Sequence, residues 1–117
     1  MSNWKTPMRL VEYLDKKGAI NDKGQEKLLN GVALAKEMSE QFRCEAMLPF
    51  ATSAIRSAEN SEKVLDKVEK ETGVRLRILS GDDEARLTFL AVRRWYGWSA
   101  GRICDLDIGG GSLEMSI

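Results

Sequence analysis

The chain has 117 residues, and its 18 basic and 18 acidic residues give a formal net charge of zero. This length suits one domain with a modest core, and the balanced charge creates no general attraction to nucleic acid or to anionic membranes. No apolar run approaches the roughly 20 residues that a transmembrane helix needs, and the N-terminal segment lacks the apolar stretch of a signal peptide. We therefore expect a cytoplasmic protein that binds neither nucleic acid nor membranes.

The absence of histidine removes several catalytic classes. Serine–histidine–aspartate triads, cysteine–histidine pairs, histidine-bearing zinc sites and phosphohistidine mechanisms all need this residue. A cysteine phosphatase would need an arginine six residues after its cysteine, whereas Phe50 and Gly110 stand six residues after Cys44 and Cys104. Both cysteines fall in predicted strands, so we expect buried thiols that form no disulfide.

Apolar periodicity predicts alternating helices and strands along the first part of the chain. Apolar residues at steps of three and four predict an amphipathic helix over 22–42. The short apolar run 44–50 predicts a strand. A second amphipathic stretch predicts a helix over 61–72, and Gly73 supplies a typical helix end. Alternation at period two then predicts a strand over 74–80.

The remaining part of the chain predicts a third helix and two further strands. Ser80 and Asp83 fit a capping box at the start of this helix. Its predicted inner side carries Ala85, Leu87, Leu90, Ala91 and Trp95. The aromatic residues near its end are expected to pack in the core and at its rim rather than to stack on bases. Segments 102–108 and 112–117 predict strands joined by glycines.

The predicted order, α-β-α-β-α-β-β, is typical of an α/β fold with a mainly parallel sheet, helical crossovers and a C-terminal hairpin turned by glycines. Ligands of open parallel sheets bind at the carboxyl ends of the strands. Three motifs follow predicted strand ends, namely 52–56, 81–86 and 109–112. We therefore expect these motifs to form one composite site.

A run of glycines followed by a hydroxyl group is the most informative motif: Gly109, Gly110, Gly111 and Ser112. Glycines let backbone N–H groups converge on one point, which creates a concavity suited to phosphate oxygens. Asp107 and Glu114 flank the run, and carboxylates beside a phosphate site imply a cation or an attacking water between them. The plain alternative is a tight hairpin turn, for which fewer glycines would suffice.

Other phosphate-binding classes fit this motif less well. No Gly-Lys-Ser/Thr follows, as a Walker A loop needs, and the next predicted element is a strand rather than the helix of a dinucleotide site. Asp105 with Asp107 also resembles phosphatases that form an aspartyl-phosphate. Those enzymes carry a hydroxyl or β-branched residue where this chain has Gly109.

Arg56 and Glu84 complete the predicted site. Arg56 follows the hydroxyl residues Thr52 and Ser53, and an arginine fork with helping hydroxyls binds phosphate well. A solvent-exposed ion pair is an equally good interpretation of this arginine. Acidic residues favour helix starts, which accounts for Asp83 well and for Glu84 poorly. A carboxylate that faces the glycine run could instead orient or deprotonate a water that attacks phosphorus.

Taken together, three motifs resemble those of the exopolyphosphatase/guanosine pentaphosphate phosphatase (Ppx/GppA) family: Phe50–Arg56, Leu79–Leu87 and Asp107–Glu114, in that order and spacing. The resemblance covers most of the chain, from about Met8 onward. It implies an actin-like, ribonuclease H-like ATPase fold. It also implies Mg²⁺-dependent hydrolysis of the terminal phosphates of inorganic polyphosphate and, in some members, of guanosine pentaphosphate.

The resemblance further implies roles for individual residues. Glu84 resembles the catalytic base, and Arg56 resembles a phosphate-binding arginine. The run 109–112 matches a second phosphate loop. Asp107 and Glu114 resemble the acids that hold the metal and the attacking water, which makes Glu114 a catalytic residue as well.

The chain departs from the family at Asp83, which is usually glutamate, and at Leu113, which is usually threonine. It also lacks the first phosphate loop, Asp-x-Gly-Ser-Asn-Ser, and the second domain. We therefore expect residues 1–117 to form a partial N-terminal domain that is weak or inactive alone and that dimerises through an exposed sheet edge. Two alternatives stay open: a non-catalytic phosphate- or nucleotide-binding module, regulatory or truncated, and a piece of an actin-like kinase or ATPase.

Overall fold

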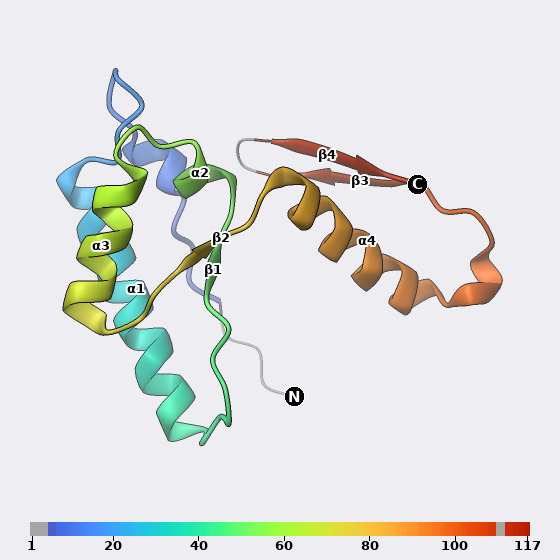
Figure 1. The fold of residues 1–117 in the computed structure, drawn as a ribbon, viewed down its shortest axis with the longest axis horizontal. Helices are drawn as coiled ribbons and strands as arrows, with labels where there is room; N and C mark the ends of the chain where they lie inside the picture. Colours follow the sequence, from blue (N-terminus) through green and yellow to red (C-terminus); the bar gives the residue numbers. More distant parts are fainter. Residues whose placement is uncertain (1–4, 110–111) are drawn as a thin grey trace.

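The computed structural model describes residues 5–109 and 112–117, and Figure 1 shows their arrangement. Helices α1 and α3 pack against each other, with the short strands β1 and β2 beside them, whereas α4 lies along the hairpin of β3 and β4. The elements are, in chain order, the 3₁₀ helix η1 (Leu10–Tyr13), α1 (Asp22–Gln41), β1 (Phe50–Ala51), α2 (Ser53–Arg56), α3 (Ser61–Thr72), β2 (Arg77–Ile78), α4 (Gly81–Tyr96), the 3₁₀ helix η2 (Trp98–Ala100), β3 (Asp105–Ile108) and β4 (Leu113–Ser116).

The strands form two separate sheets in the described residues, which corrects the expectation of one mainly parallel sheet. β1 and β2 are parallel, with Phe50 opposite Arg77, whereas β3 and β4 are antiparallel. The strand expected over 44–50 begins only at Phe50, because the preceding Pro49 has no N–H to donate to a ladder. The α/β class and the antiparallel final pair are confirmed. The expected turn glycines Gly110 and Gly111 lie outside the described residues.

The packing of α1 on α3 supplies the core. α3 ends where the sequence predicts, because Gly73 adopts a left-handed φ of 71° that side chains disfavour. Val64 and Val68, on the inner face of α3, are each 1% exposed. The full core cluster consists of Leu10, Ile20, Leu28, Val32, Ala51, Ile55, Ala58, Val64, Val68 and Val74.

Asn60 ties the start of α3 to the segment before α1. Its side-chain oxygen accepts from the Ile20 N–H at 2.8 Å, and its amide donates to the Ile20 carbonyl at 2.9 Å. Replacing Asn60 by alanine removes both bonds around the 1% exposed Ile20. We expect the free energy of unfolding to fall by about 1–3 kcal/mol, because paired backbone groups lose their partners. Urea denaturation measures this change, and Asn30→Ala, at an exposed position of α1, should stay within about 0.5 kcal/mol of the parent chain.

Asp15 stabilises the turn that follows η1. Its carboxylate accepts from the backbone N–H of Ala19 at 3.0 Å and of Lys17 at 2.7 Å. These bonds, that from Ala19 first, lower the pKa of Asp15 below its ordinary 3.8. The stability that the turn gains is therefore present above this value and is lost as the pH falls through the lowered pKa. A ¹³C titration of the Asp15 carboxyl should give a midpoint below 3.8, and an unshifted midpoint would contradict these bonds.

Three sequence expectations about burial are wrong. Both cysteines are free, as expected, but both are exposed, because no strand forms at either position: Cys44 follows the end of α1, and Cys104 precedes β3. The expected inner side of α4 is not buried, because every residue of this helix is at least partly exposed. Trp95 and Trp98 are 84% and 86% exposed, so these aromatics do not pack in a core of the described residues.

Across residues 5–109 and 112–117, no helix combines the length and the hydropathy that crossing a lipid bilayer requires.

Candidate active site

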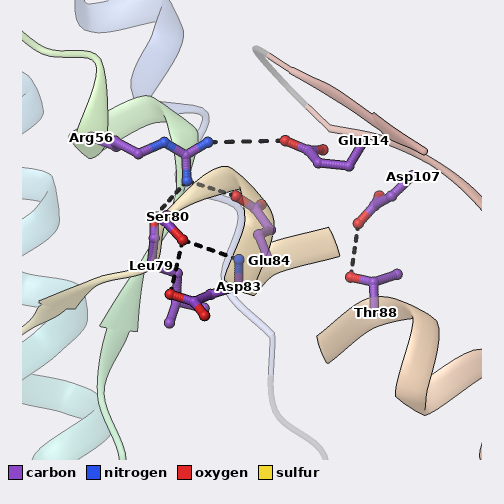
Figure 2. Close-up of polar contacts among 8 residues, drawn as sticks. All are labelled: Arg56, Leu79, Ser80, Asp83, Glu84, Thr88, Asp107 and Glu114. Atoms are coloured by element: carbon purple, nitrogen blue, oxygen red, sulfur yellow. Dashed lines mark hydrogen bonds and ion pairs between the residues drawn. The ribbon is translucent and has the colours of Figure 1, made fainter. Parts of the chain in front are cut away.

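Arg56 lies where three chain segments meet. It ends α2, the short helix that directly follows β1. Its Nη1 donates to the carbonyl of Leu79 at 2.6 Å and to Oε2 of Glu84 at 2.9 Å, and its Nη2 lies 3.9 Å from Oε1 of Glu114 (Figure 2). The guanidinium therefore connects the end of β2, the first turn of α4 and strand β4. The structure thus brings Arg56, Glu84 and Glu114 together, whereas the expected contribution of Gly110 and Gly111 lies outside the described residues.

The start of α4 holds Glu84 in place. The side chain of Ser80 accepts from the N–H of Asp83 at 3.1 Å, and its hydroxyl donates to the carboxylate of Asp83 at 2.8 Å (Figure 2). The cap expected from these two residues is thereby confirmed. Because the cap sets the direction of the first turn, the next side chain, Glu84, points toward Arg56 rather than into solvent, and it is 16% exposed.

Glu114 carries an oxygen that lacks a partner. Its side chain is 9% exposed, and its Oε2 is buried with no hydrogen-bond partner among the described residues. The hydroxyl of Ser112 is buried and unpaired in the same sense. A buried polar atom without a partner costs about 1–3 kcal/mol, and more when it is charged. Ser112 directly precedes β4 and Glu114 lies within it, and buried polar atoms without a protein partner are commonly satisfied by water, an ion or a ligand.

Asp107 stands opposite Glu114 in the register of β3 and β4. Its Oδ2 accepts from the hydroxyl of Thr88 at 3.0 Å, as Figure 2 shows. Thr88 was not among the site residues predicted from the sequence. It lies four residues after Glu84 and hence on the same side of α4, and this spacing was the signal that could have identified it.

The oxygen donors of this region suit Mg²⁺. Asp107 and Glu114 supply carboxylates from facing strands, and Ser112 supplies a hydroxyl. The described residues contain no cluster of three or more acidic or cysteine ligands. Mg²⁺ commonly uses one or two carboxylates together with water and substrate phosphates. The unpaired oxygen of Glu114 is thus the donor at which such an ion would fit.

The other residues expected to bind phosphate are close in sequence to Arg56 or to Glu114. Thr52 precedes α2, and its side chain forms no capping hydrogen bond in the described structure; Ser53 begins α2 and is 8% exposed. The N–H of Gly109, which follows β3, donates to the carbonyl of Ser112, which precedes β4, at 3.0 Å. Gly110 and Gly111 are expected phosphate ligands that lie outside the described residues.

Residues 1–117 match the Ppx/GppA phosphatase family along their whole length. The chain belongs to the Ppx/GppA phosphatase family. It is 56% identical over 116 residues to Exopolyphosphatase 1 of Mycobacterium tuberculosis, an alignment that covers 99% of this chain and 34% of that protein. The Ppx/GppA chain therefore spans about a third of the length of the curated relatives it matches.

Solved structures of Ppx/GppA proteins resemble this fold. The Aquifex aeolicus family member superposes with a TM-score of 0.77 at 29% identity, over 92% of this chain and 35% of that one. An exopolyphosphatase from Cytophaga hutchinsonii gives a TM-score of 0.76 at 26% identity, over 87% of this chain and 34% of that one. These neighbours confirm the expected actin-like, ribonuclease H-like family fold in its coarse form.

The bond between Thr88 and Asp107 yields a prediction for this Ppx/GppA chain. Thr88→Val keeps the shape of the side chain but removes the hydroxyl that orients Asp107. If Asp107 holds Mg²⁺, we expect Mg²⁺ affinity in the presence of short-chain polyphosphate to fall by about 10–100-fold, as when other outer partners of metal ligands are lost. Calorimetry measures the affinity, and Thr88→Ser should restore it. Equal affinity of the valine and serine variants would contradict an orienting role.

Proposed function

We propose that this chain forms the phosphate- and metal-binding half of a phosphohydrolase that releases terminal phosphate from inorganic polyphosphate. Guanosine pentaphosphate, which carries the same phosphoanhydride chemistry, is the second proposed substrate. The observation that carries the proposal is the convergence of Arg56, Glu84 and Glu114 from three separate segments. The relatives named exopolyphosphatase support the substrate class.

Phosphate binding is assigned to Arg56, whose guanidinium can offer a planar pair of donors to phosphate oxygens. Its Nη2 is held only loosely, at 3.9 Å from Glu114, and is the end available for a phosphate oxygen. The hydroxyls of Thr52 and Ser53 and the loop of 109–112 are proposed as further donors. Backbone N–H groups of that loop other than that of Gly109, which donates to Ser112, would stabilise the charge on the terminal phosphate without titrating.

The proposed hydrolysis is an in-line attack by water on the terminal phosphorus. Glu84 accepts the proton of the attacking water, a P–O bond forms to that water, and the bond to the bridging oxygen breaks with its electron pair staying on that oxygen. Asp107 and Glu114 would hold Mg²⁺, which when bound neutralises charge on the phosphate oxygens. Glu114 also lies 3.9 Å from Nη2 of Arg56 and would help to direct the guanidinium to the substrate.

We propose that the chain acts in the cytoplasm, and that by itself it hydrolyses polyphosphate weakly. Phosphoryl transfer depends mainly on positioning and electrostatic stabilisation from several sides of the phosphate. Among the described residues, Arg56 is the arginine at the proposed phosphate position, and the expected donors Gly110 and Gly111 lie outside them. Each missing donor in such a site lowers the rate by about 10²–10³-fold.

Phosphate binding without turnover is the second candidate function. The observation that favours it is the 2.9 Å bond from Arg56 to Oε2 of Glu84, because an oxygen held by a guanidinium is not free to accept a proton from water. The two candidates share a ligand and differ in whether phosphate is released.

A ¹⁵N NMR titration with short-chain polyphosphate and Mg²⁺ tests both candidates. We expect shifts at the amides of Gly109 and Ser112, at the side chain of Arg56 and at Glu84. Arg75, whose exposed side chain pairs with Glu69, should stay unshifted and serves as the internal control. Phosphate released during the titration supports the hydrolase, and binding without release supports the module. A folded spectrum with no shifts would contradict the proposal. A parallel titration with ATP provides the comparison: tighter binding of ATP than of polyphosphate would also contradict the proposal and would favour an actin-like kinase or ATPase.

A further inference from the structure

One nitrogen of the Arg56 guanidinium makes two hydrogen bonds to different segments. Nη1 donates to the carbonyl of Leu79 at 2.6 Å and to Oε2 of Glu84 at 2.9 Å, as Figure 2 shows. An arginine Nη atom carries two N–H groups, so these bonds use both donors of Nη1. Nη2 lies 3.9 Å from Glu114, which is longer than a hydrogen bond. A phosphate can therefore bind at the edge formed by Nη2 and Nε without displacing either partner of Nη1.

The carbonyl of Leu79 gives the guanidinium a fixed reference. The N–H of Leu79 donates to the carbonyl of Ala51 at 3.0 Å, which continues the pairing of β2 with β1. Ala51 belongs to the buried core, and the Arg56 side chain is 24% exposed. Because this acceptor is a backbone group held by the strand pair, the guanidinium keeps its orientation independently of the carboxylate of Glu84.

The bond from Arg56 makes the two oxygens of Glu84 inequivalent. Oε2 accepts from Nη1, so Oε1 is the oxygen left to take a proton from water. The backbone end of this side chain is fixed separately, because Ser80 caps the first turn of α4. A general base acts only within hydrogen-bond reach of its proton, and a third group commonly sets its orientation. Arg56 occupies the position of such a third group.

We propose that Arg56 is a positioning residue for the base Glu84 while it binds phosphate: Nη1 holds Oε2 so that Oε1 faces the attacking water, and the edge of Nη2 and Nε binds the terminal phosphate. This inference rests on the proposed function, since it needs a phosphate at Arg56 and a water activated by Glu84. One planar group then fixes the base relative to phosphorus. Lysine, a point charge, cannot hold both partners in a fixed geometry.

NMR of the ¹³C,¹⁵N-labelled 117-residue chain tests this bridge directly. A scalar coupling across the hydrogen bond, from ¹⁵Nη1 of Arg56 to ¹³Cδ of Glu84, should be present in the free chain, with separate signals for Nη1 and Nη2. Both features should persist when short-chain polyphosphate and Mg²⁺ shift the amides of Gly109 and Ser112. Arg75, whose pair with Glu69 is exposed, should show averaged Nη signals and is the internal control.

Phosphate release at saturating polyphosphate supplies the catalytic readout. Arg56→Lys should lower the saturated rate by about 10–100-fold, because a misplaced base loses its alignment with the water, and should also raise KM. Loss of uniform substrate binding alone would raise KM and leave the saturated rate unchanged, and that result would overturn the positioning role. Arg75→Lys, the same substitution in an exposed ion pair, should change neither quantity.

The NMR outcomes separate this inference from the proposed function, and they do not depend on whether a variant folds. Shifts at Gly109 and Ser112 together with loss of the coupling would mean that phosphate displaces Glu84 from Arg56. That result overturns the inference and leaves phosphate binding intact. Averaged Nη signals and no coupling in the free chain would also overturn it. A coupling without any shifts at those amides would contradict the proposed function itself and reduce the bond to a structural ion pair.

Discussion

Replacing Arg56 by alanine is expected to weaken polyphosphate binding and to destabilise the fold at the same time. The guanidinium pairs with Glu84 and Glu114, whose side chains are 16% and 9% exposed, and it also satisfies the carbonyl of Leu79. Its removal leaves two partly buried carboxylates without a cation. We expect the free energy of unfolding to fall by about 2–3 kcal/mol. Binding should weaken by at least about tenfold, because a charge-assisted bond contributes about 1.5–3 kcal/mol.

Two variants separate the phosphate role of Arg56 from its structural role. Arg56→Lys keeps the charge but loses the planar fork, so we expect much of the stability to return while phosphate binding stays weak. Arg75→Ala removes an arginine from an exposed ion pair with Glu69 and should change neither property. Urea denaturation and calorimetry with short-chain polyphosphate measure the two effects. Full binding by the lysine variant would contradict the assignment of a guanidinium fork.

Replacing Glu84 by glutamine is expected to eliminate phosphate release while leaving substrate binding intact. The amide keeps the size of the side chain and can still accept from Arg56, but it cannot take a proton from the attacking water. General-base catalysis of this kind contributes about 10²–10⁴-fold, so the weak release expected of the chain should fall below detection. Affinity for polyphosphate with Mg²⁺ should stay equal or increase, since one negative charge near the phosphate has been removed.

Phosphate release during long incubation and calorimetry of the same samples measure these two properties. Asp82→Asn removes a neighbouring charge at an exposed position of α4 and serves as the control, with release and binding both retained. Release that survives Glu84→Gln would contradict the role of base. A parent chain that binds polyphosphate without any release would instead support the non-catalytic module.

Short-range patterns predicted the helices of this chain well. The stop of α3 at Gly73 and the cap of α4 by Ser80 depend on a few neighbouring residues, whose conformational preferences act without the rest of the fold. Strands were predicted less well, because a ladder needs a partner elsewhere in the chain. The segment 74–80 alternates as a strand should, yet only Arg77 and Ile78 pair with β1.

The sequence by itself determined the chemical inventory of this Ppx/GppA chain: an arginine after β1, an acid in the first turn of α4, and a glycine run flanked by two acids. Only the tertiary structure decided how these groups meet. It placed Arg56 between Glu84 and Glu114, left Oε2 of Glu114 without a partner among the described residues, and joined Thr88 to Asp107. The physical reason is that residue type and spacing set local conformation, whereas distances between segments follow from the packing of helices and strands far apart in the chain.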